Sequence, residues 1–474
     1  MKINTFERSS LSTAIKTILI GSGAALAISA GAPVQAGEVD DVKQEVQQLL
    51  ERIDQLEAEQ ASAAGESVTA SAEESTSLVM KNDPYETGVV RNRSHQDFTP
   101  EGVDPIDFKL GGTDTIVTVS GYVKLDAIYD VDQDVGDSFV FSSIAPDGTA
   151  AADSGPHTRF HARQSRLRVK SSTPVGDKEI KTHIEADFFG NGGNETFSNS
   201  TSLRIRHAYV SYGGWLFGQY WSNFQENDFV AYPGTVDFFG PVGQSFMRQA
   251  QIRYTWENGF SVSAENPETT GTGSLGSLRE STGGVGSDEL PDFTVAWRGG
   301  SAGAGGAYEF SAVFRELGVK ADTTGDGNND IDETESGTGF MAAGGWNIGD
   351  STYLYAHYNF GDGIGRYIIN GFQNDLFVDA NGNVDTVESS GGNIGVTFDV
   401  GDMDKINFVY GFFENEDPAE SNGIDELTSF HASYWNHRQA GLSLGYEVIF
   451  GEAEYSDGSE GDNTRLQFAV QKSF

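Results

Sequence analysis

The sequence predicts an all-β protein, a 16-stranded antiparallel transmembrane β-barrel with a short N-terminal periplasmic coiled-coil helix. Composition is the first reason, because 59 glycines, 12 prolines, 31 Phe and 17 Tyr suit strands joined by tight turns and aromatic residues at membrane interfaces. The second reason is an alternation of polar and apolar residues that recurs from Thr115 to Phe474. The third is that short and long connections alternate along the chain, as in bacterial outer-membrane barrels.

The first 36 residues have the pattern of a secretory signal peptide. Three basic residues precede an apolar stretch from Ile18 to Ala30, and Val34-Gln35-Ala36 provides a cleavage site. A retained N-terminal anchor is the weaker alternative, because the apolar stretch is short for a membrane-spanning helix. Removal of residues 1–36 takes away three basic residues and one acid, which changes the net charge from −40 to −42. A charge of this size excludes nucleic acid as a partner.

Residues 37–60 form the one segment with helical periodicity. Val39, Val42, Val46, Leu49, Ile53 and Leu56 are spaced alternately three and four residues apart, the a/d pattern of a heptad repeat. We interpret this segment as a periplasmic helix that joins subunits. Because the stripe is short, a lone amphipathic helix or one docked at the barrel mouth is the alternative. Residues 61–110 are rich in Ala, Ser, Glu and Pro without a period, and we expect a linker there.

From Thr115 onward the chain has the period of β-strands, so residues 111–474 are expected to form the barrel. Val117, Val119, Val123 and Leu125 occupy odd positions, while mostly polar residues fill the even ones. We place strand starts near 115, 158, 178, 201, 214, 249, 259, 291, 305, 338, 351, 392, 403, 427, 439 and 463.

The connections between these strands fall into two classes. Short turns include Asn258-Gly259, Gly349-Asp350 and Gly401-Asp402. Between the short turns lie the long connections 131–157, 190–200, 222–248, 267–290, 317–337, 361–391, 415–426 and 453–462. This order predicts that all long loops lie at one end of the barrel. The last alternating stretch ends on Phe474, which resembles the C-terminal signal of outer-membrane proteins.

Basic residues are scarce, and nine of the 30 lie between Arg159 and Arg206. Charged and apolar residues alternate there; for example, Arg166 and Arg168 flank Leu167. An arginine at the lipid midplane costs about 2–4 kcal/mol, so the charged side of each strand is expected to face the lumen. The predicted pore-lining residues are Arg159, Arg163, Arg166, Arg168, Lys170, Lys181, His183, Arg204, Arg206 and Arg253.

Such a basic wall suits anions, because guanidinium groups bind carboxylates and phosphates in a bidentate manner. The alternative is that these side chains pair with lumenal acids such as Asp126, Glu185 and Asp187 and act only as struts of the barrel.

Residues 222–248 carry more aromatic side chains than a solvated loop requires. An apolar loop needs a surface to pack against, and the lumen opposite the basic wall provides one. We interpret this segment as a constriction loop, with its three acids as counter-charges to the wall. The alternative is a latch that lies over a neighbouring subunit. The candidate residues are Glu226, Asp228, Tyr232, Asp237 and Phe238.

One acidic loop matches the donor spacing of a twelve-residue calcium loop. The calcium candidates are Asp322, Asp326, Asp330 and Glu333. Acidic loops rich in Gly and Asn match this pattern often, so a solvated loop without metal is the preferred interpretation, and no other cofactor is expected. The chain has no cysteine, and it lacks a nucleophile elbow and a phosphate-binding glycine loop, so we expect no enzyme.

Three stretches of the sequence resemble the DcaP-like outer-membrane porins. They cover roughly residues 112–256, with weaker similarity to the C-terminus, and they are Gly112-Thr113-Asp114-Thr115 leading into Ser120 to Asp130, Arg204 to Val210 with Gly218 to Phe224, and Thr235 to Pro241 with Arg248 to Tyr254. The resemblance implies a sixteen-stranded barrel, a homotrimer, an N-terminal periplasmic helix and an arginine-rich pore in the Gram-negative outer membrane.

The expected function is therefore passive diffusion of small anionic solutes, with dicarboxylates as the class that the family implies. Outer-membrane lipid and lipopolysaccharide are the expected surroundings. Two alternatives remain: a general or sugar-selective porin in which the arginines are struts, and a plugged barrel that serves as an adhesin or envelope tether.

Overall fold

The computed structural model describes residues 105–474, except 226–233, 277, 279–283, 302–305, 325, 370–373, 402 and 417–422. The expected signal peptide, the heptad helix at 37–60 and nearly all of the expected linker lie outside the described residues. None of the helices within the described ranges is long and apolar enough to cross a membrane.

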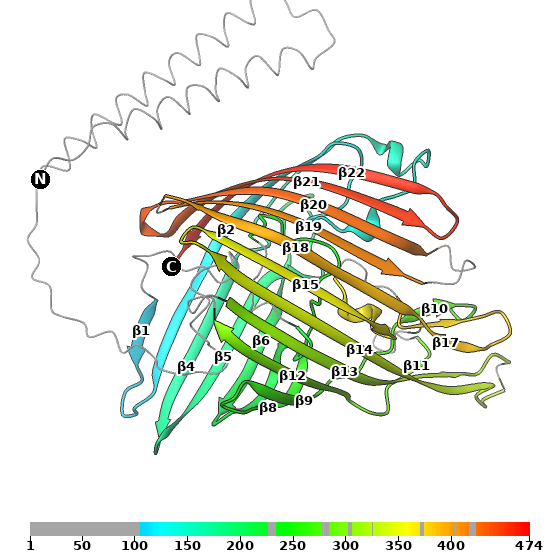
Figure 1. Cartoon of the computed structure of the whole chain (residues 1–474), viewed down its shortest axis with the longest axis horizontal. Coiled ribbons are helices and arrows are strands. Elements are labelled where there is room, and N and C mark those ends of the chain that lie inside the picture. The colour runs from blue at the N-terminus through cyan, green and yellow to red at the C-terminus, as the bar shows by residue number, and fades with distance from the viewer. Residues whose placement is uncertain are drawn as a thin grey trace, which may run out of the picture. The chain divides into compact units, whose positions relative to one another are not determined.

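One antiparallel sheet closes on itself (Figure 1). Each barrel strand pairs with the next one along the chain, and the last pairs with the first from Tyr122↔Ser473 to Asp130↔Arg465. β3 and β4 both pair with β2 and form one strand interrupted at 162–165. Sixteen strands therefore cross the barrel, which confirms the predicted number. The strands are β2 (Ile116–Asp130), β3 (His157–His161), β4 (Arg166–Val175), β5 (Lys178–Gly190), β6 (Ser202–Tyr212), β7 (Trp215–Trp221), β8 (Arg248–Thr255), β9 (Phe260–Glu265), β12 (Asp292–Ser301), β13 (Gly306–Ala321), β14 (Ile331–Ile348), β15 (Thr352–Asp362), β18 (Glu388–Val400), β19 (Asp404–Asn415), β20 (Ile424–His437), β21 (Leu442–Tyr455) and β22 (Glu460–Ser473).

Short elements extend the barrel at both ends. β1 (Ile106–Lys109) pairs with the start of β2 and lies inside the segment expected to be a linker. Two long connections contribute β10 (Gly271–Gly273), β16 (Leu376–Val378) and β17 (Val384–Thr386) to a separate three-stranded sheet, and β11 (Gly286–Ser287) adds to β13. The described 3₁₀ turns are η1 (Phe141–Ser143), η2 (Ala152–Ser154), η5 (Gly365–Tyr367) and η7 (Gln439–Gly441).

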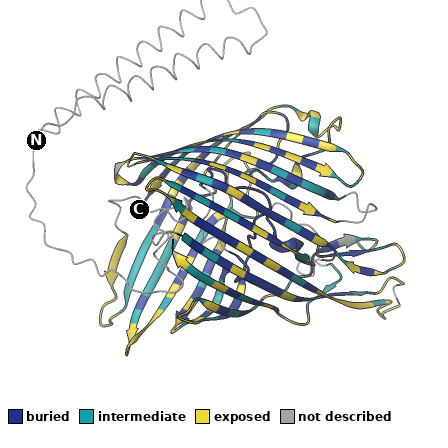
Figure 2. Cartoon of the chain, in the orientation of Figure 1, coloured by how far each residue is buried: buried dark blue, intermediate teal, exposed yellow. Residues whose placement is uncertain are grey.

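The barrel is apolar outside and polar inside. In β5, Ile180 and Ile184 are exposed, whereas His183, Glu185 and Asp187 are buried. Buried and exposed bands alternate along most strands (Figure 2). An exterior of this kind is stable in hydrocarbon, and the closed ladder leaves no barrel edge to desolvate.

The connection expected at 317–337 is mostly strand. β13 continues to Ala321 and β14 starts at Ile331, so only residues 322–330 form the loop. Positions 332–336 are exposed on both faces, so neither face is apolar and the sequence has no alternation to mark them. The backbone ladder continues there without help from side-chain burial.

Placing a charge on the outer face should destabilise the barrel. Ile184 lies on the outside of β5 and is 58% exposed. The substitution Ile184→Arg should lower the free energy of unfolding by about 2–4 kcal/mol at the membrane midplane. Urea titration in lipid vesicles measures the change. Glu179→Arg, at the end of the same strand, should cost about 1 kcal/mol or less. Equal effects of the two substitutions would argue against a lipid-facing surface at Ile184.

Candidate functional site

Glu185 is the centre of a cluster of arginines on the lumen side of β4, β5 and β6. Its carboxylate accepts hydrogen bonds from Arg168 Nε at 2.8 Å and from Arg206 Nε at 2.7 Å. Arg166 Nη1 lies 3.4 Å from the same carboxylate. Three guanidinium groups therefore share one buried acid, and the strand register, which pairs Arg168 with Glu185, places them side by side.

Asp187 binds the remaining arginine of these strands. Arg204 donates from Nε and Nη2 to the two carboxylate oxygens at 3.0 and 2.7 Å, which is the bidentate geometry typical of this pair. Arg206 Nη1 also donates to Asp187, at 3.2 Å. All four arginines thus have an acidic partner, which is the pairing that the strut interpretation expects.

A β-bulge in β6 turns two consecutive side chains toward the lumen. Glu185 on β5 pairs with His207, but the next pair along the strands is Ala186 with Ile205. Arg206 is thus the extra residue, and both Arg206 and His207 are buried. Bulges commonly redirect a side chain next to a functional site. The alternation predicts the direction of Arg206 but not that of His207.

Arg248, the first residue of β8, joins this cluster without an acid of its own. Its guanidinium lies 4.3 Å from the ring centroid of Trp221 and 5.2 Å from that of Phe246. Arg204 and Arg206 are close enough to repel it. Its Nη1 is buried with no hydrogen-bond partner, and within the described part of the chain Arg248 forms no ion pair.

Alternation along the sequence does not mark Arg248 as a pore residue, for a physical reason. Its position in β8 has the parity of Ala250 and Ile252, which face outward, so alternation places it toward lipid. The cluster of Arg166, Arg168, Arg204, Arg206 and Arg248, which we call the basic cluster, holds five guanidinium groups beside two carboxylates. It therefore has an excess of three positive charges.

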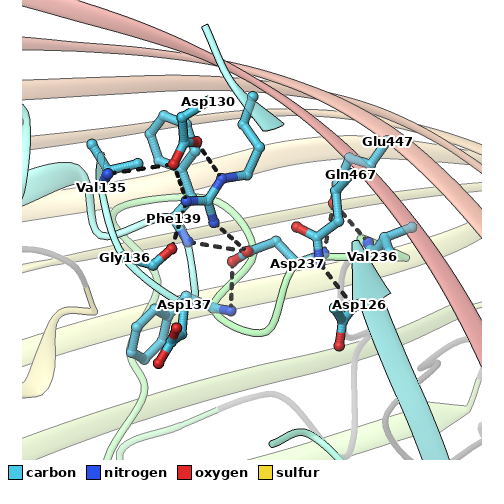
Figure 3. Close-up of polar contacts among 12 residues, drawn as sticks. Asp126, Asp130, Val135, Gly136, Asp137, Phe139, Val236, Asp237, Glu447 and Gln467 are labelled. Carbon is cyan, nitrogen blue, oxygen red and sulfur yellow. Dashed lines mark hydrogen bonds and ion pairs between the residues drawn. The ribbon is translucent and has the colours of Figure 1, made fainter. Parts of the chain in front are cut away.

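The described end of the expected constriction loop, residues 234–247, is here called the lumenal loop. It docks on the wall formed by β2 and β19–β22 (Figure 3). The N–H groups of Val236 and Asp237 donate to Glu447 Oε2 at 2.9 and 2.6 Å. Lys124 Nζ donates to the carbonyl oxygen of Val236 at 2.7 Å. Trp435 Nε1 donates to the carbonyl oxygen of Gly234 at 3.1 Å. The loop is thus bonded to the wall across from its own strands.

Asp237 faces a different partner from the one expected. Instead of opposing the basic cluster, its carboxylate lies 3.4 Å from Arg465 Nη1 and accepts the N–H of Phe139 at 3.0 Å. Arg465 in turn holds both carboxylate oxygens of Asp130, at 2.7 and 2.9 Å. At Asp237 the lumenal loop has already crossed to the wall formed by β2 and β19–β22, so its carboxylate meets Arg465 rather than the basic cluster. The other candidate acids and the tyrosine, Glu226, Asp228 and Tyr232, lie outside the described residues.

Phe238 contacts the basic cluster itself. Its ring centroid lies 5.0 Å from the guanidinium carbon of Arg204 and 5.5 Å from that of Arg206. These are distances of cation–π contacts. Asp237 and Phe238 are adjacent in sequence, so the lumenal loop touches the far wall with one residue and the arginines with the next.

Three long connections share an apolar core inside the barrel. Phe141 comes from 131–157, Val242 from 222–248 and Ile368 from 361–391, and all three are buried in one cluster. Inward side chains of the wall complete the cluster: Val313, Met341, Val409, Phe413, Leu427 and Ile449. These wall residues belong to β13–β21, and none lies on the strands of the basic cluster.

Other predicted pore residues lie outside this cluster. Arg159 Nη2 lies 2.9 Å from Asp134 in the first long connection, and Arg163 pairs with Asp137 beside it. Arg253 donates to the carbonyl oxygen of Trp221 at 2.5 Å and to Gln251 Oε1 at 2.8 Å.

The remaining three predicted pore residues, Lys170, Lys181 and His183, lie along β4 and β5. Lys170 pairs across the strands with His183, whose ring centroid is 5.4 Å from that of His207. Lys181 Nζ lies 3.6 Å from Glu179.

The calcium candidates lie in the loop 322–330 and at the start of β14. Asp322 and Asp330 accept hydrogen bonds from N–H groups of the loop itself, at 2.7 Å from Gly327 and 2.8 Å from Thr323. No group of three or more His, Asp or Glu side chains in the described ranges could hold a metal ion. Asp326 and Glu333 are exposed.

Comparison with known proteins shows which outer-membrane proteins the chain resembles. Residues 56–259 match the family model described as DcaP outer membrane protein. The crystal structure of the outer membrane channel DcaP of Acinetobacter baumannii is similar at 25% identity and a TM-score of 0.65, over 77% of this chain and 99% of that chain. The resemblance to the DcaP-like porins is confirmed. The chain is therefore similar to outer-membrane channels of the DcaP type.

Other porins of known structure show weaker similarity. The anion-selective porin from Comamonas acidovorans has 14% identity and a TM-score of 0.48, over 76% of this chain and 100% of that chain. OmpT, an outer membrane protein of Vibrio cholerae, has 14% identity and a TM-score of 0.45, over 76% of this chain and 98% of that chain. No curated protein matches the sequence.

Loss of the shared acid, Glu185, should destabilise the barrel. Glu185→Gln leaves three arginines without their buried carboxylate, and breaking a buried pair costs about 3–5 kcal/mol. Urea unfolding in lipid vesicles measures the loss. Glu179→Gln is the matched control in the same strand, where the acid is 42% exposed and a surface pair contributes about 1 kcal/mol or less. If both variants unfold at the same urea concentration, Glu185 does not hold the cluster together.

The loop 322–330 should lose structure only in acid. The hydroxyl and N–H of Thr323 donate to Asp330 and keep the pKa of that carboxyl below its ordinary value. The stabilisation is complete above the unfolded-state pKa of about 3.9 and is lost as pH falls through the lower folded-state pKa. Hydrogen exchange should show protection of the Thr323 and Thr324 amides down to about pH 4 and a decline below it. Asp330→Asn should abolish this pH dependence, and an unchanged profile would contradict the assignment.

Proposed function

We propose that this DcaP-type channel passes small anionic solutes by passive diffusion along the basic cluster, with dicarboxylates as the expected class. The DcaP match supports a channel rather than an enzyme. The excess of three positive charges at the basic cluster supports an anionic solute, although the chain as a whole is acidic. A local field inside a narrow, low-dielectric lumen acts on a solute more strongly than distant charges in salt solution.

The observation that carries the proposal is Arg248, which forms no ion pair with any residue in the described ranges. The other four arginines already have carboxylate partners, and those pairs hold β4, β5 and β6 together. Arg248 instead has a buried N–H group with no acceptor, beside Arg204 and Arg206. A solute carboxylate would supply the acceptor that the protein does not, and it would relieve the repulsion between the arginines. Among the described residues, the cluster therefore combines four arginines that hold the strands together with one, Arg248, that is available to bind an anion.

The apolar core restricts where a solute can travel. Ions and dicarboxylates need hydration or polar partners, which the cluster around Phe141, Val242 and Ile368 does not offer. A hydrated path then has to run beside the arginines. We expect such a path to lie close enough to Arg248 for its charge to act on a passing solute.

The same core favours one alternative, a plugged barrel that acts as an adhesin or envelope tether. Three long connections fill part of the lumen. Conductance separates the two candidates, because a tether has no need of an ion path.

The DcaP resemblance also supports further proposals. We propose a homotrimer in the Gram-negative outer membrane, surrounded by lipid and lipopolysaccharide, with the heptad segment 37–60 as a periplasmic assembly helix. Analytical ultracentrifugation in detergent, with and without residues 37–60, tests whether that segment joins the subunits.

Single-channel recording in a KCl gradient tests the anion proposal. Wild type should prefer chloride, and Arg248→Gln should reduce the permeability ratio of chloride to potassium about fivefold, since one charge at about 4 Å changes an anion's free energy by about 1 kcal/mol even in water. Lys178→Gln removes the same charge at the end of β5, where the ammonium lies over Tyr212, and should leave the ratio unchanged. A wild type that prefers potassium would refute anion selectivity. A wild type that does not conduct would favour the plugged barrel.

A further inference from the structure

We propose that Glu447 is a positioning residue that fixes the lumenal loop and thereby sets how closely Phe238 covers Arg204 and Arg206. Glu447 lies on β21, in the part of the wall to which the lumenal loop is bonded. The inference rests on the proposed function, because it assigns the device that sets the width and selectivity of the anion path.

Glu447 binds the lumenal loop by its backbone. Its Oε2 accepts two consecutive N–H groups, from Val236 at 2.9 Å and from Asp237 at 2.6 Å (Figure 3). Its Oε1 lies 3.1 Å from His431 Nδ1 on β20, and the side chains of both residues are buried. Two N–H groups on one ionised oxygen fix the orientation of the peptide between them, and hydrogen bonds to an ionised acceptor are stronger than neutral ones.

The charged neighbours of Glu447 hold the same stretch of chain by other atoms. Lys124, on β2, donates to the carbonyl oxygen of Val236 and pairs with Asp126 at 2.9 Å. Arg465, on β22, pairs with the side chain of Asp237. These contacts hold a carbonyl and a carboxylate. Glu447 alone among the described residues receives both N–H groups, which would otherwise be buried without an acceptor.

Glu447 binds the two residues that precede Phe238, so it affects how Phe238 contacts the basic cluster. Asp237 Oδ1 accepts the N–H of Phe239 at 3.0 Å, which fixes the turn around Phe238. Loss of the N–H bonds at 236 and 237 would leave this turn held to the wall only through the carbonyl oxygen of Val236 and the side chain of Asp237. The ring of Phe238 would then lose its fixed distance from the two arginines.

The later part of the lumenal loop is held separately. Ser429 Oγ accepts the N–H of Val242 at 3.1 Å, and Asn359 Nδ2 donates to the carbonyl oxygen of Gly243 at 2.8 Å. Gly243 has a φ of +85°, and a Cβ there would meet the carbonyl oxygen of Phe412 at 1.8 Å. Because these contacts do not involve Glu447, its substitution should free only the part of the loop around residues 235–239.

A thiol reporter tests the position of the loop directly. The chain has no cysteine, so Phe238→Cys introduces a unique reactive group. In that background we compare Glu447→Met with Glu447→Gln in lipid vesicles, using a membrane-impermeant, negatively charged methanethiosulfonate. Both substitutions remove the charge, but only glutamine keeps an oxygen that can accept the two N–H groups. Glu447→Met should speed modification about tenfold, equivalent to about 1.4 kcal/mol, and Glu447→Gln should restore a rate near that of the parent.

Electrical recording of channels that retain Phe238 gives the second readout. Glu447→Met should increase open-channel noise and reduce the preference for chloride, while Glu447→Gln should keep both near wild type. Glu452→Ala is the matched control, because Glu452 lies on the same strand but faces outward, and it should change neither readout. If Glu447→Met does not fold, Glu447→Ala replaces it, with folding monitored by heat modifiability in electrophoresis.

The outcomes separate the inference from the proposed function. Equal effects of methionine and glutamine would mean that the charge of Glu447 acts directly, and the positioning role would be wrong. An unchanged thiol rate in a wild type that prefers chloride would overturn the positioning role alone. A faster thiol rate with methionine in a channel without chloride preference would uphold the anchored loop and refute the anion path.

Discussion

Closure of the sheet between β2 and β22 is the constraint on which the rest of the structure depends. Hydrocarbon offers no hydrogen-bond partners, so every backbone group of a spanning strand has to bond to a neighbouring strand. Antiparallel closure over sixteen strands satisfies this requirement and leaves two faces with opposite chemistry. Each lumen-facing charge is then shielded from lipid but has to find a partner inside. The ion pairs around Glu185 and around Arg465 follow from that need.

Two of these networks have different roles. One joins neighbouring strands, as Glu185 and Asp187 do for β4, β5 and β6. The other joins the wall to a loop, as Arg465 and Glu447 do for Asp237 and Val236. Because both carry buried charges, removal of a single partner costs more than the pair contributes. Arg248 departs from this pattern, and the departure distinguishes it from the arginines that hold the barrel together.

Much of the barrel could be predicted from the sequence, because alternation reports which face meets lipid. It places Arg166, Arg168, Arg204 and Arg206 inward. It fails where the backbone departs from regular pairing, as at the bulge that turns His207 inward and at the strand start that turns Arg248 toward the cluster. It also says nothing of tertiary partners. Aromatic content predicts that residues 222–248 pack inside, but the bonds of Val236 to Glu447 join positions 211 residues apart, and no local pattern reports them.

The two walls of the lumen differ in sign as well as in chemistry. The basic cluster has an excess of positive charge among the described residues, whereas the part of the wall formed by β2, β21 and β22, with its docked loop, holds the carboxylates of Asp126, Asp130, Asp237 and Glu447 against the cations of Lys124 and Arg465. A transverse electric field therefore crosses the path of a solute. A dipolar molecule would turn its negative end toward the arginines as it passes, whatever its net charge. Passage then depends on how a solute's charges are arranged along its length, so zwitterions and neutral molecules of equal size would be distinguished.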